Sequence, residues 1–196
     1  TLTLTGGISG NTYNLIVTGT GAGVESGVIA TTTGTLTKQG SGTWTLSGDN
    51  SYSGAVTIAA GTLNVNTVAD SGSNSSLGTG GTTPEISIGA TGVLKYTGAG
   101  HSTNRAITLT ASGPTIDASG SGTLTLTGGI SGNTFDLTLT GTGNGVESGV
   151  IAITTGTLTK QGSGTWTLSG ANTYTGATTV YGGTLKGGAD NVFGGA

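Results

Sequence analysis

The sequence predicts an all-β fold, a β-solenoid of short strands whose corners carry glycine or asparagine. Three observations point to it: glycine fills 42 of the 196 positions, threonine fills 43, and threonine alternates with apolar residues. Alternation with a period of two is typical of strands that bury one face, as in Thr43, Trp44, Thr45 and Leu46. Helical periodicity is absent from every segment of the sequence.

Eleven short runs of β type, each closed by glycine or asparagine, divide the first 122 residues. Runs this short do not suit a conventional sandwich, whereas a parallel β-solenoid stacks short strands turn upon turn. We therefore expect each run to pair with its counterparts in the adjacent turns, at about four turns per unit. The expected strands are 2–4, 15–18, 28–31, 35–38, 43–46, 55–58, 62–65, 86–88, 93–96, 106–109 and 115–117.

A long internal repeat organises the chain. Residues 1–66 recur as residues 123–188 with an offset of 122, and 50 of the 66 aligned positions are identical. We expect residues 1–122 to be the first long repeat unit of the solenoid and residues 123–196 to be a partial second unit, within one continuous solenoid. We also expect the chain to be a fragment of a longer protein, and equivalent residues such as Trp44 and Trp166 to stack in register.

Composition excludes several classes of function. Charged residues make up 7 %, the net charge is −3, and the five basic residues are scattered, which leaves no patch for nucleic acid. No apolar run approaches the roughly 18 residues of a membrane helix, so we expect no membrane insertion of this segment. The chain has no cysteine and a single histidine, His101, so we expect no metal and no cofactor.

The acidic residues form no obvious catalytic pair. Catalysis by two carboxylates would need two acids on one face, and the eight acids are spread along the chain. Their repeat counterparts are often lost, since Asp49 corresponds to Ala171 and Asp136 corresponds to Asn14. We therefore predict no enzymatic activity and no catalytic residue.

Two 30-residue segments share a denser motif. Residues 34–63 read GTLTKQGSGTWTLSGDNSYSGAVTIAAGTL, and residues 156–185 read GTLTKQGSGTWTLSGANTYTGATTVYGGTL. The motif resembles the autotransporter-associated β-strand repeat, also called the passenger-associated transport repeat, of large bacterial surface proteins. The resemblance implies a right-handed parallel β-helix that is exported to the bacterial cell surface or the medium. It also implies a role in scaffolding and secretion rather than in chemistry.

Four residues of this motif recur in both copies and are the candidate structural residues. They are Lys38, Trp44, Asn50 and Tyr52 in the first copy, and Lys160, Trp166, Asn172 and Tyr174 in the second. The tryptophans either fill the solenoid interior or a corner, or they form with the tyrosines a platform that stacks on sugars. The asparagines follow a strand at a turn, where a side-chain amide can bond the backbone.

A glutamate also recurs with each motif lysine. Glu25 and Lys38 are 13 residues apart, as are Glu147 and Lys160. The spacing favours a cross-strand ion pair between neighbouring strands. A solvated lysine and a ligand site are the alternatives.

The sequence favours a structural function, a stiff rod segment of a long, repetitive extracellular bacterial surface protein or filament. Its partners would be copies of itself, arranged end to end along the solenoid axis. The alternative is an adhesin or glycan-binding passenger domain of an autotransporter, with a surface polysaccharide as partner. In that case the least repetitive loops, 68–84 and 98–105, would carry the contacts.

Overall fold

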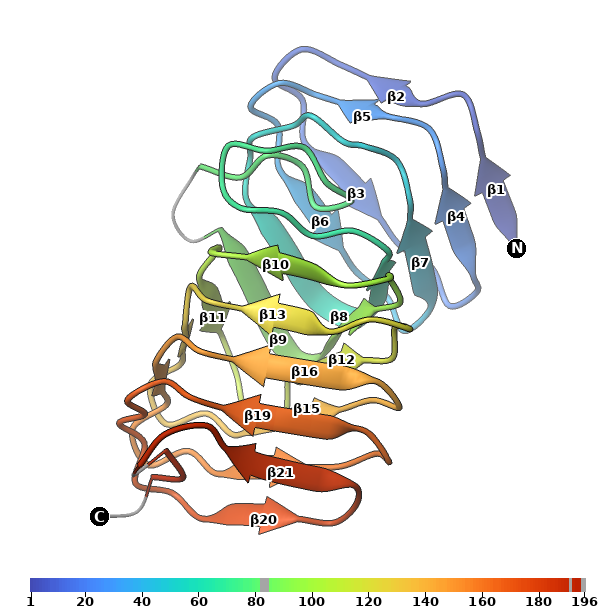
Figure 1. The fold of residues 1–196 in the computed structure, drawn as a ribbon. Coiled ribbons are helices and arrows are strands. Elements are labelled where there is room, and N and C mark those ends of the chain that lie inside the picture. Colours follow the sequence, from blue (N-terminus) through green and yellow to red (C-terminus); the bar gives the residue numbers. More distant parts are fainter. Residues whose placement is uncertain (82–84, 191, 195–196) are drawn as a thin grey trace.

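The computed structural model describes residues 1–81, 85–190 and 192–194, and within these ranges the chain is all-β (Figure 1). Parallel strands stack turn upon turn into a β-solenoid of about nine turns. The predicted fold class is thus confirmed. The described ranges contain no helix long and apolar enough to cross a membrane.

The first face of the solenoid is an uninterrupted ladder of parallel strands (Figure 1). We number the three faces in the order in which the chain crosses them in each turn. In chain order the first face contains β1 (Leu2–Leu4), β4 (Gly23–Glu25), β7 (Thr43–Leu46), the second half of β8 (Val56–Val65), the second half of β9 (Ile86–Tyr96), β12 (Thr115–Ala118), β15 (Leu137–Thr140), β18 (Leu158–Lys160) and β20 (Thr178–Val180).

The other two faces are built in the same parallel manner. The second face contains β2 (Ile8–Ser9) and β5 (Ile29–Ala30), and later β10 (His101–Thr103), β13 (Leu124–Leu126), β16 (Asn144–Glu147), β19 (Thr165–Leu168) and β21 (Thr184–Gly187). The third face contains β3 (Leu15–Val17), β6 (Leu36–Lys38), the first halves of β8 and β9, β11 (Ile107–Leu109), β14 (Ile130–Ser131) and β17 (Ile151–Ala152).

One inward position of the first face defines the turns. Its residues pair in the order Leu2, Gly23, Trp44, Leu63, Leu94, Ile116, Leu139, Lys160 and Val180. Each step advances 19 to 23 residues, except for the 31 residues from Leu63 to Leu94, where a long corner loop is added. Outward neighbours along these strands are mostly threonine, as the alternation predicted.

The strand boundaries differ from the prediction in two ways. The segments predicted as separate strands at 55–58 and 62–65 form the single bent strand β8, and β9 joins the next two in the same way. Within the described part of residues 1–122, three strands, β2, β4 and β10, were not predicted. Strand β4 was not predicted because it contains Gly23, and glycine is typical of a turn. Here Gly23 lies opposite Trp44, and the indole fills the space that a side chain at position 23 would take.

The two repeat units do not occupy the same faces. Five ladder steps lead from Leu2 to Ile116 on the first face, and the equivalent of Leu2, Leu124, lies on the second face. One unit therefore spans five turns and one further face out of three, in place of the four or so turns that were predicted.

The predicted stacking of Trp44 and Trp166 in register is wrong for this reason. Trp44 belongs to the first-face ladder and stands in line with Lys160. Trp166 belongs to the second face, where its ladder partners are Gly145 and Leu185. Equivalent residues thus recur one face further around the rod.

Candidate functional site

The motif lysine of each copy lies inside the solenoid at a corner. The Lys38 ammonium donates hydrogen bonds to the carbonyls of Gln39, Gly40 and Ala60 at 2.7, 2.7 and 2.9 Å. The corner turns contain Gly40 and Gly61, both with a φ of +67°, a conformation that glycine adopts without steric cost. Lys160 makes the same set of three contacts in the second copy.

The predicted ion pair between Glu25 and Lys38 is wrong. Glu25 ends β4 on the first face, Lys38 ends β6 on the third, and both side chains are buried. Glu25 Oε1 accepts a hydrogen bond from the Gly27 amide at 2.7 Å, while Oε2 has no partner among the described residues. Burial lowers the pKa of the Lys38 ammonium, whose charge is met by carbonyl dipoles instead of a carboxylate.

The equivalent glutamate of the second copy is a buried acid. Glu147 is 0 % exposed, and neither of its carboxyl oxygens accepts a hydrogen bond of ordinary geometry within the described ranges. Desolvation raises the pKa of this carboxyl to about 8, although the nearby Gly149 amide lowers it in part. Inside the folded chain the group is therefore mostly protonated at neutral pH.

The motif tryptophans lie in the interior, each opposite a glycine. Trp44 is 7 % exposed and Trp166 is 0 % exposed. A Cβ on either ladder partner, Gly23 or Gly145, would overlap the indole ring. Each indole N–H donates to a backbone carbonyl, at 3.2 Å in the first copy and 2.9 Å in the second. Because the rings are covered, they do not offer a stacking platform for sugars.

The motif asparagines brace a corner between turns. Oδ1 of Asn50 accepts from the Ile29 amide at 2.8 Å, and Oδ1 of Asn172 accepts from the Ile151 amide at the same distance. Their Nδ2 groups donate to backbone carbonyls at 2.9 and 2.6 Å. Each side chain thus bridges backbone groups that are far apart in the sequence.

The motif tyrosines are buried but differ in their hydrogen bonding. The Tyr174 hydroxyl lies 2.9 Å from Thr178 Oγ1. Val56 takes the place of this threonine in the first copy, and the Tyr52 hydroxyl has no partner among the described residues. Burial raises the pKa of Tyr52, and the charge of Arg105 opposes this shift.

Arg105 joins the two least repetitive loops, an arrangement that sequence spacing did not indicate. It is 1 % exposed, its guanidinium donates to backbone carbonyls at 2.7 and 3.1 Å, and its Nε lies 3.5 Å from Glu85 Oε2. The amide of Ser71 in the first loop donates to Asn104 Oδ1 of the second at 2.8 Å. Residues 82–84 of the first loop lie outside the described residues.

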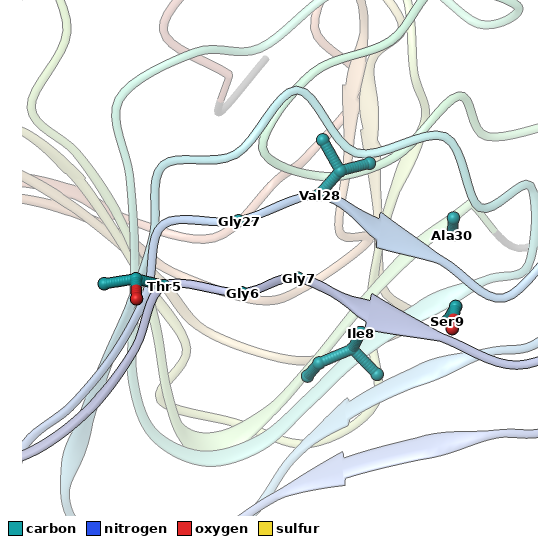
Figure 2. A pocket seen from close by; sticks show the side chains of 8 residues that line it. All are labelled: Thr5, Gly6, Gly7, Ile8, Ser9, Gly27, Val28 and Ala30. Atoms are coloured by element: carbon teal, nitrogen blue, oxygen red, sulfur yellow. The ribbon is translucent and has the colours of Figure 1, made fainter.

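An open groove recurs at equivalent places in the two copies. The first-copy groove has a volume of about 310 Å³ and is lined by Thr5, Gly6, Gly7, Ile8, Ser9, Gly27, Val28 and Ala30 (Figure 2). The second-copy groove, of about 450 Å³, is lined by Ala106 and the eight equivalent residues, Thr127, Gly128, Gly129, Ile130, Ser131, Gly149, Val150 and Ala152.

The grooves were not predicted, although the sequence carries a signal for them. The segment TGGIS occurs at residues 5–9 and again at 127–131. Alternation alone does not show that Val28 and Val150 are 46 % and 41 % exposed. Only the folded arrangement places each valine beside two glycines of the preceding turn.

The stacked turns and the buried motif residues define the class of protein, a tandem-repeat β-solenoid whose recurrent residues serve packing. Residues 36–65 and 158–186 match the passenger-associated-transport-repeat family. The chain therefore carries two passenger-associated transport repeats, which confirms the resemblance seen in the sequence.

The chain is also similar to the Adhesin BmaC autotransporter of Brucella suis biovar 1 (strain 1330). The two are 40 % identical over 144 residues, which cover 73 % of this chain and 4 % of that protein. The chain thus spans a small part of the length of this relative. No solved structure matches the chain.

Proposed function

We propose that this chain is a spacer rod within the passenger of an autotransporter at the bacterial cell surface. The observation that carries the proposal is the first-face ladder, in which nine strands pair in succession from β1 to β20. Strands spaced by about 4.8 Å make a rod roughly 40 Å long from nine turns. Because every turn is bonded to the next, the rod is stiff along its axis.

The contacts of the motif residues support a structural function. The polar groups of Lys38, Trp44 and Asn50 bond backbone groups of their own or neighbouring turns. The pair of Arg105 and Glu85 holds a loop on the rod. We infer a non-enzymatic, extracellular function, which the repeat family and the name of the relative support.

The second candidate is a glycan-binding adhesin. The relative is named an adhesin, and the groove around Val28 recurs around Val150. In this alternative the grooves, together with the loops joined by Arg105, would contact a surface polysaccharide.

Small-angle scattering tests the rod, and a glycan array separates the two candidates. The spacer rod predicts a rigid particle of roughly 40 Å along the solenoid axis and no specific binding on the array. Specific binding to one class of glycan would favour the adhesin, provided that Val150→Asp abolishes it without changing the melting temperature.

We expect the isolated chain to associate end to end. Leu2 and Val180, the inward residues at the two ends of the first-face ladder, are 55 % and 49 % exposed. Unpaired strand edges pair readily with other strands, and charges on them prevent this. The double variant Leu2→Lys with Val180→Lys should shift sedimentation towards the monomer, whereas Thr108→Lys in the middle of the rod should not. Monomers alone at every concentration of the unaltered chain would contradict the expectation.

A further inference from the structure

The second repeat unit is rotated by one face around the rod relative to the first, and we call this rotation the one-third-turn phase. It decides which surfaces of the two units share a face. The outward residue Thr43 pairs along one ladder with Thr62, Val93, Thr115, Thr138 and Thr159. Its equivalent in the second unit, Thr165, lies on the next face in β19. The units share 50 of 66 aligned residues, yet their equivalent surfaces point in different directions around the rod.

The surface that repeats in this way includes exposed apolar groups. Among the described residues, the exposed large apolar side chains of the first and last turns are Leu2, Tyr13, Ile16, Val180, Tyr181 and Phe193, and those between the end turns are Val28 and Val150. Figure 2 shows Val28 beside Gly27 and across from Gly6 and Gly7, whose lack of side chains leaves this stretch of the groove open between Thr5 and Ile8. An exposed valine next to a glycine-lined hollow is able to contact the same feature of a second rod.

One such contact is too small to hold two rods together. Stable interfaces bury roughly 1,200–2,000 Å², and a groove of 310 or 450 Å³ lined by small residues provides only a fraction of that area. Several contacts in a row on one face would act together, because the first contact raises the effective concentration of the others. Tandem units that spanned a whole number of turns would create such a row.

We propose that the one-third-turn phase prevents side-by-side association of this chain with a second copy of itself. Each unit presents its groove and valine alone on its face, and tandem units of this kind would return to a given face only at every third unit. A second rod lying alongside then engages one contact instead of a row, and the association stays weak.

Two double variants of equal composition test this proposal. Thr43→Trp with Thr159→Trp places both indoles on one face, five turns apart, whereas Thr43→Trp with Thr165→Trp places them on successive faces. Both pairs are made in the Leu2→Lys, Val180→Lys background, so that association through the ends is suppressed equally. A parallel set with isoleucine, which suits strands, provides the same comparison if a tryptophan variant fails to fold.

Sedimentation velocity over a range of concentrations should show dimers of the one-face variant with a Kd about a hundredfold lower than that of the successive-face variant. Equal association of the two variants would overturn the proposal. The proposal would also be overturned if Val28→Thr with Val150→Thr caused a large loss of lateral association of the parent chain. Such a loss would show that the native contacts already bind a second copy. Neither result bears on the rod length, which tests the proposed function separately.

Discussion

Replacing Trp166 by alanine is expected to lower the free energy of unfolding by about 3 to 5 kcal/mol. The indole is 0 % exposed, and the adjacent turn carries Gly145 at the ladder position that faces it. Removal of the ring therefore leaves a cavity that no neighbouring side chain on that ladder step is able to fill. The Thr140 carbonyl, which accepts from the indole N–H at 2.9 Å, also loses its side-chain donor.

Thermal and urea unfolding followed by circular dichroism measure this effect. Tyr181→Ala is the matched control, because it also removes an aromatic ring but one that is 76 % exposed. Its cost should stay within about 0.5 kcal/mol. Trp44→Ala should resemble Trp166→Ala, and the two losses should add, since the residues lie several turns apart. Full stability of both tryptophan variants would contradict the assignment of the indoles to the packed interior.

The sequence was sufficient to predict the solenoid because its signals are local. Alternation places Trp44 and Leu46 on one side of a strand and Thr45 on the other, and the structure has this pattern in β7. Strand β4 was missed because a glycine such as Gly23 indicates a turn locally. Glycine is present at this position because the indole of Trp44, in the next turn, occupies the space of a side chain. A contact between turns leaves no local signal in the sequence.

The phase of the repeat could not be predicted for a related reason. Identity at an offset of 122 shows which residues are equivalent but not how many turns separate them. The number of turns depends on the length of each turn, and the step from Leu63 to Leu94 is about half as long again as the others. Sequence spacing likewise placed Glu25 near Lys38, although the two residues end strands on different faces.

The stability of the chain should fall as the pH rises from about 4.5 to about 8, and Glu147 should be a main cause. Its pKa is raised from 4.5 to about 8 in the folded chain, mainly by desolvation. Between these values the folded chain binds a proton at this carboxyl that the unfolded chain has released. Stability therefore decreases with pH across this window and levels off above it. The loss amounts to several kcal/mol, because each pKa unit corresponds to about 1.4 kcal/mol.

Glu147→Gln should remove this slope, because an amide stays neutral throughout the window. We expect the variant to be more stable than the parent at pH 8, with a flatter profile between pH 4.5 and 8. Urea midpoints at half-unit intervals of pH measure both effects.

The control is Asp136→Asn. Hydrogen bonds from Thr157 lower the pKa of Asp136, so this carboxylate stabilises the fold above its ordinary pKa. The carboxylate loses that effect only as the pH falls below its ordinary pKa. Asp136→Asn should thus lower the stability by a nearly constant amount between pH 4.5 and 8 and leave the slope in this window unchanged. A parent profile that is flat from pH 4.5 to 8, or a slope that persists in Glu147→Gln, would show that the buried carboxyl is not held in its protonated form.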